Sequence, residues 1–159
     1  MNVREVMHKP VQCCHAGDSL EMAAQLMAQN DCGAIAVVDQ ANHAIGIVTD
    51  RDIALLAAER HQPLWELKAG ELMGQHDLYS CQDDTDLHAA LRLMADKKVR
   101  RLPVLGRDGD LHGMVAMSDI LHHLSLSGAS ARSAPEDWRE ALQAFNSVTS
   151  PSLPLIMPK

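Results

Sequence analysis

The strongest constraint on the fold is an internal repeat, in which the second half of the chain resembles the first at a fixed separation of 67 positions. Four apolar residues at helical spacing recur in this way: Leu20, Ala23, Leu26 and Met27 return as Leu87, Ala90, Leu93 and Met94. The same register continues without a gap to Asp52, which falls on Asp119. Repeats of this kind are single supersecondary units that bury their apolar faces by stacking. We therefore expect two similar units with a joint core.

The first unit predicts a helix, a hairpin and a second helix. Asp18 or Ser19 is suited to cap the first helix, and Asp50 is suited to cap the second. The predicted elements are a helix from Leu20 to about Asn30, strands over 34–38 and 45–49, and a helix from 50 to about 60.

The second unit repeats this order. Its predicted elements are a helix over 87–97 preceded by Thr85, strands over 101–105 and 111–116, and a helix from Ser118. Short strands near 11–14 and 78–81 would lead the two units, so that each is β-α-β-β-α. A unit of about 55 residues is too small to bury a sufficient core alone. The predicted fold class is therefore mixed α+β, with the two repeats packed sheet to sheet about a pseudo-two-fold axis.

This pattern divides the chain into three segments. Residues 1–65 form the first repeat, 66–126 the second, and 127–159 a linker and C-terminal tail. The tail begins with a stretch rich in Ser, Ala and Gly that is typical of a flexible linker. Pro135 is suited to the first turn of a short helix, which we expect to serve in docking or dimerisation.

Composition excludes several classes of function. The net charge is −7 with only 14 Lys and Arg, which argues against broad binding to nucleic acid. The four cysteines form no C-x-x-C pair and no secretion signal opens the chain, so we expect a reduced, cytoplasmic compartment. The longest apolar runs have the length of strands, which predicts no insertion into a membrane.

No catalytic motif is present in the sequence. It lacks a P-loop, a G-x-G-x-x-G fingerprint and a G-x-S-x-G elbow. We therefore expect that the chain is not an enzyme and that any activity it regulates lies on a partner protein.

An aspartate near the start of the last helix in each unit is the leading candidate for ligand binding. Asp52 and Asp119 would lie in a first helical turn, where negative charge is favoured and where two carboxylate oxygens can accept both hydroxyls of a ribose. Helix capping is the alternative explanation for each of them.

Several motifs together resemble those of the cystathionine-β-synthase (CBS) domain family, over about residues 3–125. They are Val6-Met7 and Leu72-Met73, 36–39 and 102–105, and the segments Gly46 to Asp52 and Gly113 to Asp119. The resemblance implies a stand-alone tandem CBS pair, a Bateman module. It implies a homodimer that binds AMP, ADP, ATP or S-adenosylmethionine between the repeats and regulates an unidentified protein.

The resemblance also implies roles for individual residues. Asp52 and Asp119 would bind ribose, assisted by Thr49 in the first unit, whereas the second unit has Ala116 at that position and Ser118 as a substitute. Adenine would rest on small and apolar residues: Val11, Cys32, Gly33, Ala34 and Ile47, with Leu78, Val99 and Met114 at related places.

Phosphate recognition requires cations or free amides, and 97–101 is a dense basic run. We expect Arg100 and Arg101 to bind the anion and, with Asp119, to favour one nucleotide whose ribose lies in the second unit. The alternative is a solvated helix end, which is the preferred explanation for Lys97 and Lys98.

Two other functions remain open. The chain could be a structural dimerisation module with empty clefts, or a redox or metal sensor built on Cys13, Cys14 and His15. A metal site based on the nine histidines is not expected, because no two of them have the i, i+4 spacing that directs two imidazoles to one ion.

Overall fold

The computed structural model describes residues 1–74, 77–126, 143, 145, 146 and 148. The first unit contains β1 (Cys13–His15), α1 (Leu20–Gln29), β2 (Ala34–Val38), β3 (Ala44–Thr49) and α2 (Asp50–Arg60). The second contains β4 (Cys81–Gln82), α3 (Leu87–Lys97), β5 (Arg101–Leu105), β6 (Leu111–Ala116) and α4 (Met117–Leu126). The predicted α+β class and the predicted order of elements are confirmed.

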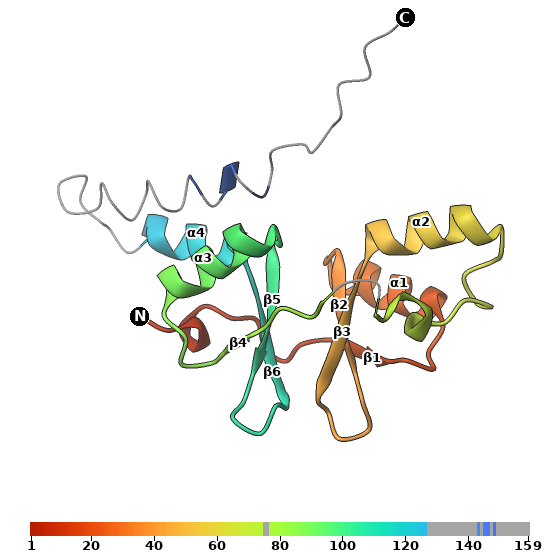
Figure 1. Ribbon diagram of the computed structural model, residues 1–159, viewed down its shortest axis with the longest axis horizontal. Coiled ribbons are helices and arrows are strands. Elements are labelled where there is room, and N and C mark those ends of the chain that lie inside the picture. The colour runs from red at the N-terminus through yellow and green to blue at the C-terminus, as the bar shows by residue number, and fades with distance from the viewer. Residues whose placement is uncertain (75–76, 127–142, 144, 147, 149–159) are drawn as a thin grey trace, which may run out of the picture.

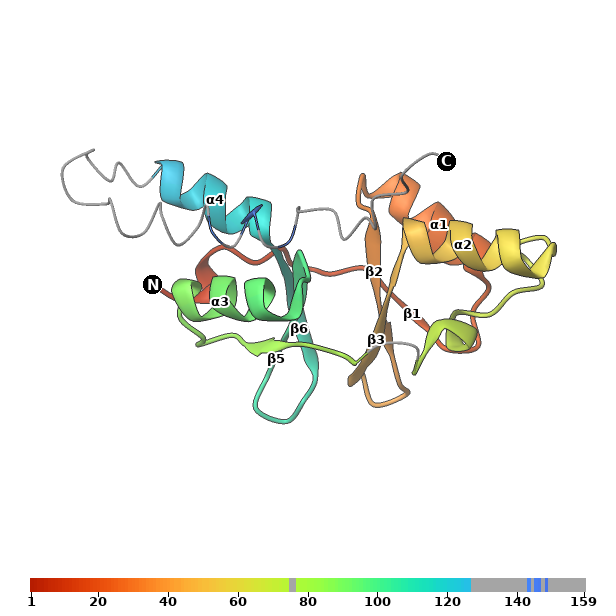
Figure 2. The same ribbon diagram turned by 45° about the horizontal axis from the view of Figure 1, so that its top comes forward.

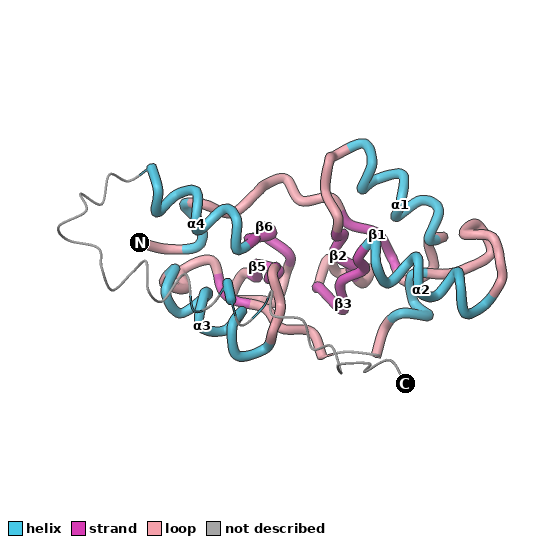
Figure 3. The backbone as a smooth tube through the Cα atoms, turned by 90° about the horizontal axis from the view of Figure 1, so that it is seen from above, coloured by secondary structure: helices cyan, strands magenta, loops and turns pink. Residues whose placement is uncertain are grey.

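Two three-stranded sheets meet in the middle of the molecule, and the helices lie outside them (Figures 1 and 3). In each sheet the short leading strand pairs in parallel with the central strand, which pairs antiparallel with the third. All five residues of β2 are buried, because one face of the strand packs on the helices of its own unit and the other faces the second sheet. Ala36 and Val38 on that second face pack with Leu111 and Met114 of β6.

The leading segment of each unit packs with the opposite unit. Val3 is fully buried in the core of the second unit, and its amide donates to the carbonyl of Thr85 at 2.8 Å. Leu67 and Leu72 are buried in the core of the first unit. Figure 2 shows the N-terminal segment, in red, crossing from the side of α3 and α4 to β1. The segment that precedes each repeat in the sequence therefore completes the core of the other unit, so that each unit contains residues from both halves of the chain.

The helices α1, α2 and α3 begin at the predicted residues, but the residue that caps α2 differs from the expectation by one position. Thr49, and not Asp50, caps α2: its Oγ1 accepts from the Asp52 amide at 3.2 Å while the Asp52 carboxylate accepts from the Thr49 amide at 3.0 Å. Asp86 caps α3, and the hydroxyl of Thr85 accepts from the Gln82 amide in the preceding turn. Ser19 caps α1, as one of the two predicted candidates.

The leading strands are shorter than predicted and lie closer to their helices, at 13–15 and 81–82. The helix expected to open at Pro135 lies outside the described residues, apart from positions 143, 145, 146 and 148, where the backbone is helical. Of these, Val148 packs against the core of the second unit. Among the helices described, none has the length and apolar character needed to cross a membrane.

Candidate functional site

Two clefts lie between the units, one beside each helix-start aspartate. The Asp52 cleft has a volume of about 280 Å³, and its lining includes Thr49, Leu78, Val99 and Arg100. The Asp119 cleft has a volume of about 340 Å³, and its lining includes His8, Val11, Cys32, Met114 and Ser118. Ala34 and Arg101 contribute to both clefts. Each cleft therefore combines the helix start of one unit with the first hairpin strand of the other.

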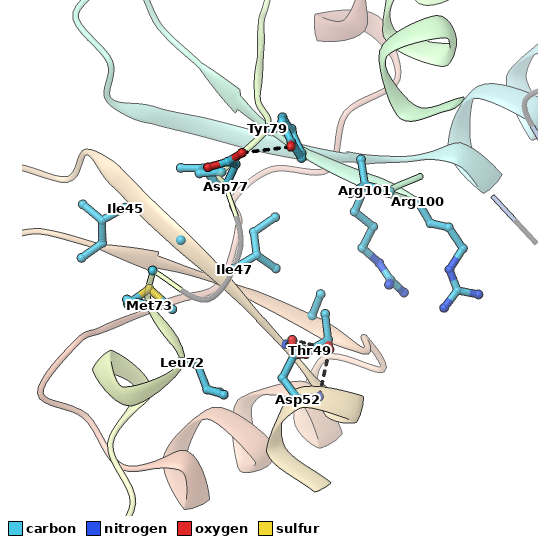
Figure 4. A pocket seen from close by; sticks show the side chains of 15 residues that line it. Ile45, Ile47, Thr49, Asp52, Leu72, Met73, Asp77, Tyr79, Arg100 and Arg101 are labelled. Atoms are coloured by element: carbon cyan, nitrogen blue, oxygen red, sulfur yellow. Dashed lines mark hydrogen bonds between the residues drawn. The ribbon is translucent and has the colours of Figure 1, made fainter. Parts of the chain in front are cut away.

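The carboxylate of Asp52 is held in one orientation and leaves one oxygen open. Its Oδ2 accepts from the Thr49 hydroxyl at 2.6 Å and from the Thr49 amide at 3.0 Å (Figure 4). Within the described part of the chain, no group donates to Oδ1. The Thr49 cap thus fixes the carboxylate through one oxygen and presents the other to the cleft.

Two guanidinium groups extend into the same cleft. The side chains of Arg100 and Arg101 run from the start of β5 toward the end of the cleft that holds Thr49 and Asp52 (Figure 4). Neither guanidinium has a hydrogen-bond or ion-pair partner among the residues that the structure describes. Two unpaired cations beside a fixed carboxylate are suited to a ligand that carries both hydroxyls and an anion.

Arg100 lies in a different cleft from the one predicted from the sequence. We expected both arginines to act with Asp119, but Arg100 lines the Asp52 cleft and only Arg101 reaches both. The reason is the packing of the sheets, which brings the first hairpin strand of the second unit to the α2 start of the first.

The other predicted residues divide between the clefts. Ile47, Leu78 and Val99 lie with Asp52, whereas Val11, Cys32, Met114 and Ser118 lie with Asp119. Gly33 is adjacent to the second group: a Cβ built on it would lie 3.0 Å from Asp50 Oδ2 and 3.6 Å from Arg101 Nη2.

The Asp52 cleft also contains residues that the sequence analysis did not assign to a site. Met73 belongs to the motif that opens the second unit, and it packs on Gly46 at the floor of the cleft. The Tyr79 hydroxyl donates to Asp77 at 3.2 Å, and this hydrogen bond raises the pKa of the tyrosine. Lys97 lies 5.1 Å from the centre of the Tyr79 ring, so it supports the rim of the cleft. No sequence pattern distinguished the aspartate and the tyrosine.

Asp119 differs from Asp52 in that both of its oxygens are engaged. Oδ2 accepts from the Ala116 amide at 2.7 Å, and Oδ1 lies 3.0 Å from Nε2 of His8. Ala116 supplies no hydroxyl, and Ser118 lines the cleft without replacing that contact. The side chain of His8 is 75% exposed and that of Asp119 is 17% exposed, so the imidazole covers the carboxylate from the solvent side.

Cys13, Cys14 and His15 do not converge on one point. On the short strand β1, Cys14 is buried in the core of the first unit, Cys13 faces the second sheet and His15 is exposed. Burial, with the charges of Asp18 and Cys13, raises the pKa of the Cys14 thiol to about 11, and burial raises that of Cys81 to about 12. In the part of the chain that the structure covers, no group of three or more His, Cys, Asp or Glu side chains is arranged to hold a metal ion.

Comparison with known proteins supports the fold. The chain is 34% identical over 137 residues to the CBS domain-containing protein YhcV of Bacillus subtilis, covering 84% of this chain and 91% of that protein. It is 31% identical over 121 residues to hypoxic response protein 1 of Mycobacterium tuberculosis, covering 76% and 83% of the two chains. It spans 61% of the length of another relative, the uncharacterized protein MK0525 of Methanopyrus kandleri, at 30% identity.

Two solved structures show the same arrangement. Hypoxic Response Protein I with two coordinated zinc ions matches with a TM-score of 0.71 at 29% identity, over 77% of this chain and 98% of that one. CBSX2 in complex with AMP matches with a TM-score of 0.67 at 25% identity, over 78% and 96%. The CBS domain family itself matches twice, at residues 3–59 and 69–126. The chain therefore belongs to the CBS domain family and carries two CBS domains in tandem.

Proposed function

We propose that the chain is a regulatory module that binds an adenine nucleotide (AMP, ADP or ATP) or an adenosyl compound such as S-adenosylmethionine between its repeats, and thereby controls a partner protein. The observation that carries this proposal is the constellation in the Asp52 cleft. There, a carboxylate and two guanidinium groups line one cavity, and one carboxylate oxygen and both guanidinium groups have no partner among the residues that the structure describes.

The chemistry of this cleft suits each part of such a ligand. A ribose diol can donate to the Asp52 carboxylate, and phosphate oxygens can accept from Arg100 and Arg101. Ile47, Leu78 and Val99 offer apolar surface to the base. The crystal structure of the related CBSX2 with AMP supports the same class of ligand for this chain.

Binding would act on the relative position of the repeats. Asp52 belongs to the first repeat and Arg100 to the second, so one ligand in the cleft contacts both. A ligand shifts a conformational equilibrium only if it binds the two conformations with different affinity, and a ligand that bridges two bodies meets this condition whenever their mutual angle changes. We further propose that the chain acts as a cytoplasmic homodimer and that any catalytic activity lies on the regulated partner.

A thermal-shift titration with AMP, ADP, ATP, S-adenosylmethionine and NAD tests the proposal. A ligand at 100 times its dissociation constant stabilises the native state by about 2.7 kcal/mol, which corresponds to a rise in melting temperature of about 5–10 °C for a domain of this size. The rise is expected to be lost in Asp52→Ala. It should be retained in Asp84→Asn, a matched control because Asp84 is exposed and lines neither cleft. The absence of a saturable shift with every compound at millimolar concentration would contradict the proposal.

A further inference from the structure

We infer that the two clefts are not equivalent: one phosphorylated adenine ligand binds per chain, in the Asp52 cleft, and His8 closes the ribose end of the Asp119 cleft. This inference rests on the proposed function and specifies its site and ligand class. It follows from three pairs of positions that the pseudo-symmetry makes comparable.

The first pair is His8 and Gly74. Met7 packs on Gly113 as Met73 packs on Gly46, so the residue after each methionine reaches the same place beside its aspartate. In one cleft this residue is His8, whose Nε2 lies 3.0 Å from Asp119 Oδ1. In the other it is Gly74, which lines the cleft, and no atom of the described residues beyond its chain neighbours lies within 4 Å of the position of a Cβ. The oxygen that a ribose hydroxyl would contact is therefore occupied in the Asp119 cleft, whereas in the Asp52 cleft none of the residues that the structure describes occupies it.

The backbone holds His8 in this place. Its amide donates to the Met114 carbonyl at 2.8 Å, and the Met114 amide donates to the His8 carbonyl at 3.2 Å. Because an ionised carboxylate only accepts hydrogen bonds, Nε2 carries the proton in this contact. A ribose in the Asp119 cleft must break the hydrogen bond between His8 and Asp119, whereas a ribose in the Asp52 cleft meets no such bond at Oδ1 from residues 1–74 or 77–126.

The second pair is Arg100 and Gly33, which stand 67 positions apart and precede the first hairpin strands. Because each cleft takes its hairpin strand from the opposite repeat, Arg100 supplies a cation to the Asp52 cleft and Gly33 supplies none to the Asp119 cleft. Arg101 lines both clefts, and each cleft has one further carboxylate, Asp77 with Asp52 and Asp31 with Asp119, so the guanidinium of Arg100 is the charge by which the two clefts differ. A phosphorylated ligand is therefore favoured in the Asp52 cleft.

The third pair is Thr49 and Ala116. The Thr49 hydroxyl donates to Asp52 at 2.6 Å and fixes the orientation of the carboxylate, whereas Ala116 offers only its amide to Asp119. All three differences favour the same cleft, although they arise from separate parts of the sequence.

Isothermal titration calorimetry of the full chain with AMP, and with adenosine as the probe without a phosphate, tests this inference. We expect one AMP per chain and at least about tenfold tighter binding of AMP than of adenosine. Asp52→Asn should weaken AMP binding by about tenfold or more, whereas Asp119→Asn should keep one site of nearly the original affinity. Arg100→Gln should weaken the binding of AMP much more than the binding of adenosine.

The possible outcomes separate the inference from the proposed function. Two AMP sites per chain, or loss of binding in Asp119→Asn with retention in Asp52→Asn, would overturn the inference and leave nucleotide binding intact. The absence of heat with AMP and with adenosine in every variant would overturn both. If Asp52→Asn does not fold, Arg100→Gln serves as the decisive variant, because the side chain of Arg100 is exposed and contributes to none of the cores.

Discussion

Replacement of Gly113 by alanine should destabilise the protein more than the same replacement at its repeat equivalent, Gly46. A Cβ at Gly113 would lie 2.9 Å from the backbone oxygen of His8 and 2.8 Å from the sulfur of Met7. A Cβ at Gly46 would meet only the side chain of Met73. The same chemical change therefore meets a backbone segment in one repeat and the end of a flexible side chain in the other.

The magnitude follows from what must move. Methionine has three rotatable bonds and adapts to an added methyl group, so Gly46→Ala should cost less than about 1 kcal/mol. At Gly113 the His8 carbonyl must move away, which breaks or lengthens the hydrogen bond that it accepts from the Met114 amide and disturbs the one that the His8 amide donates to the Met114 carbonyl. Each of these bonds has a net contribution of about 1 kcal/mol. Overpacking of Met7 adds to this, and we expect a loss of about 1–3 kcal/mol.

Urea unfolding followed by circular dichroism measures both variants against the wild type. In thermal unfolding, the expected difference in the free energy of unfolding between the two variants would appear as a difference in melting temperature of several degrees, at about 2–4 °C per kcal/mol for a chain of this size. Equal destabilisation, or a larger loss in Gly46→Ala, would refute the packing argument. Because Gly113→Ala displaces the segment that carries His8, it should also make Asp119 accessible, which a second AMP site in calorimetry would reveal.

Three further predictions concern single residues. The thiols of Cys14 and Cys81 should react slowly with Ellman's reagent at pH 8 compared with Cys13 and Cys32, because burial raises their pKa values to about 11 and about 12; equal rates for all four would contradict this. Thr49→Ala should lower the free energy of unfolding by about 0.5–2 kcal/mol through loss of the α2 cap, and it should also weaken the binding of AMP. Unchanged urea unfolding of this variant would contradict the role of the cap. Although burial raises the pKa of Asp83, the hydrogen bond and charge of Arg4, with those of His112, lower it overall. Its contribution to stability should thus be complete above the ordinary carboxyl pKa and be lost as the pH falls through the lowered value, so Asp83→Asn should flatten the acid limb of a stability profile.

The repeat made most of the fold predictable, because core positions recur at helical and strand periods. The helix over 87–97 and the strands over 34–38 and 101–105 have the predicted bounds. The cap of α2 differed by one residue from the prediction, because the adjacent polar residues Thr49 and Asp50 could both serve. A local sequence pattern does not decide which of two such neighbours is the cap, since this depends on the residue at which the backbone changes from extended to helical dihedral angles.

The candidate site was predictable in composition but not in grouping. Asp52, Thr49 and Arg101 follow from family motifs, whereas the partner of Arg100 depends on how the two sheets pack. The contact between His8 and Asp119 spans 111 positions, and it exists because the N-terminal segment packs with the opposite repeat. Such a contact leaves no periodic trace in the sequence.

The asymmetry of the clefts has a structural reason. A repeat must keep its apolar pattern because both cores and the contact between the sheets depend on it, whereas residues at the clefts contact solvent and are free to differ. Gly74 and His8, Arg100, and Thr49 and Ala116 line the clefts, and Gly33 lies between two residues that line one of them, Cys32 and Ala34. A ligand bound in the Asp52 cleft alone would draw Asp52 and Arg100 together without an equal change at the Asp119 cleft. Occupancy of one cleft would thus tilt the repeats relative to each other, and a tilt is a change of shape that a partner protein can recognise.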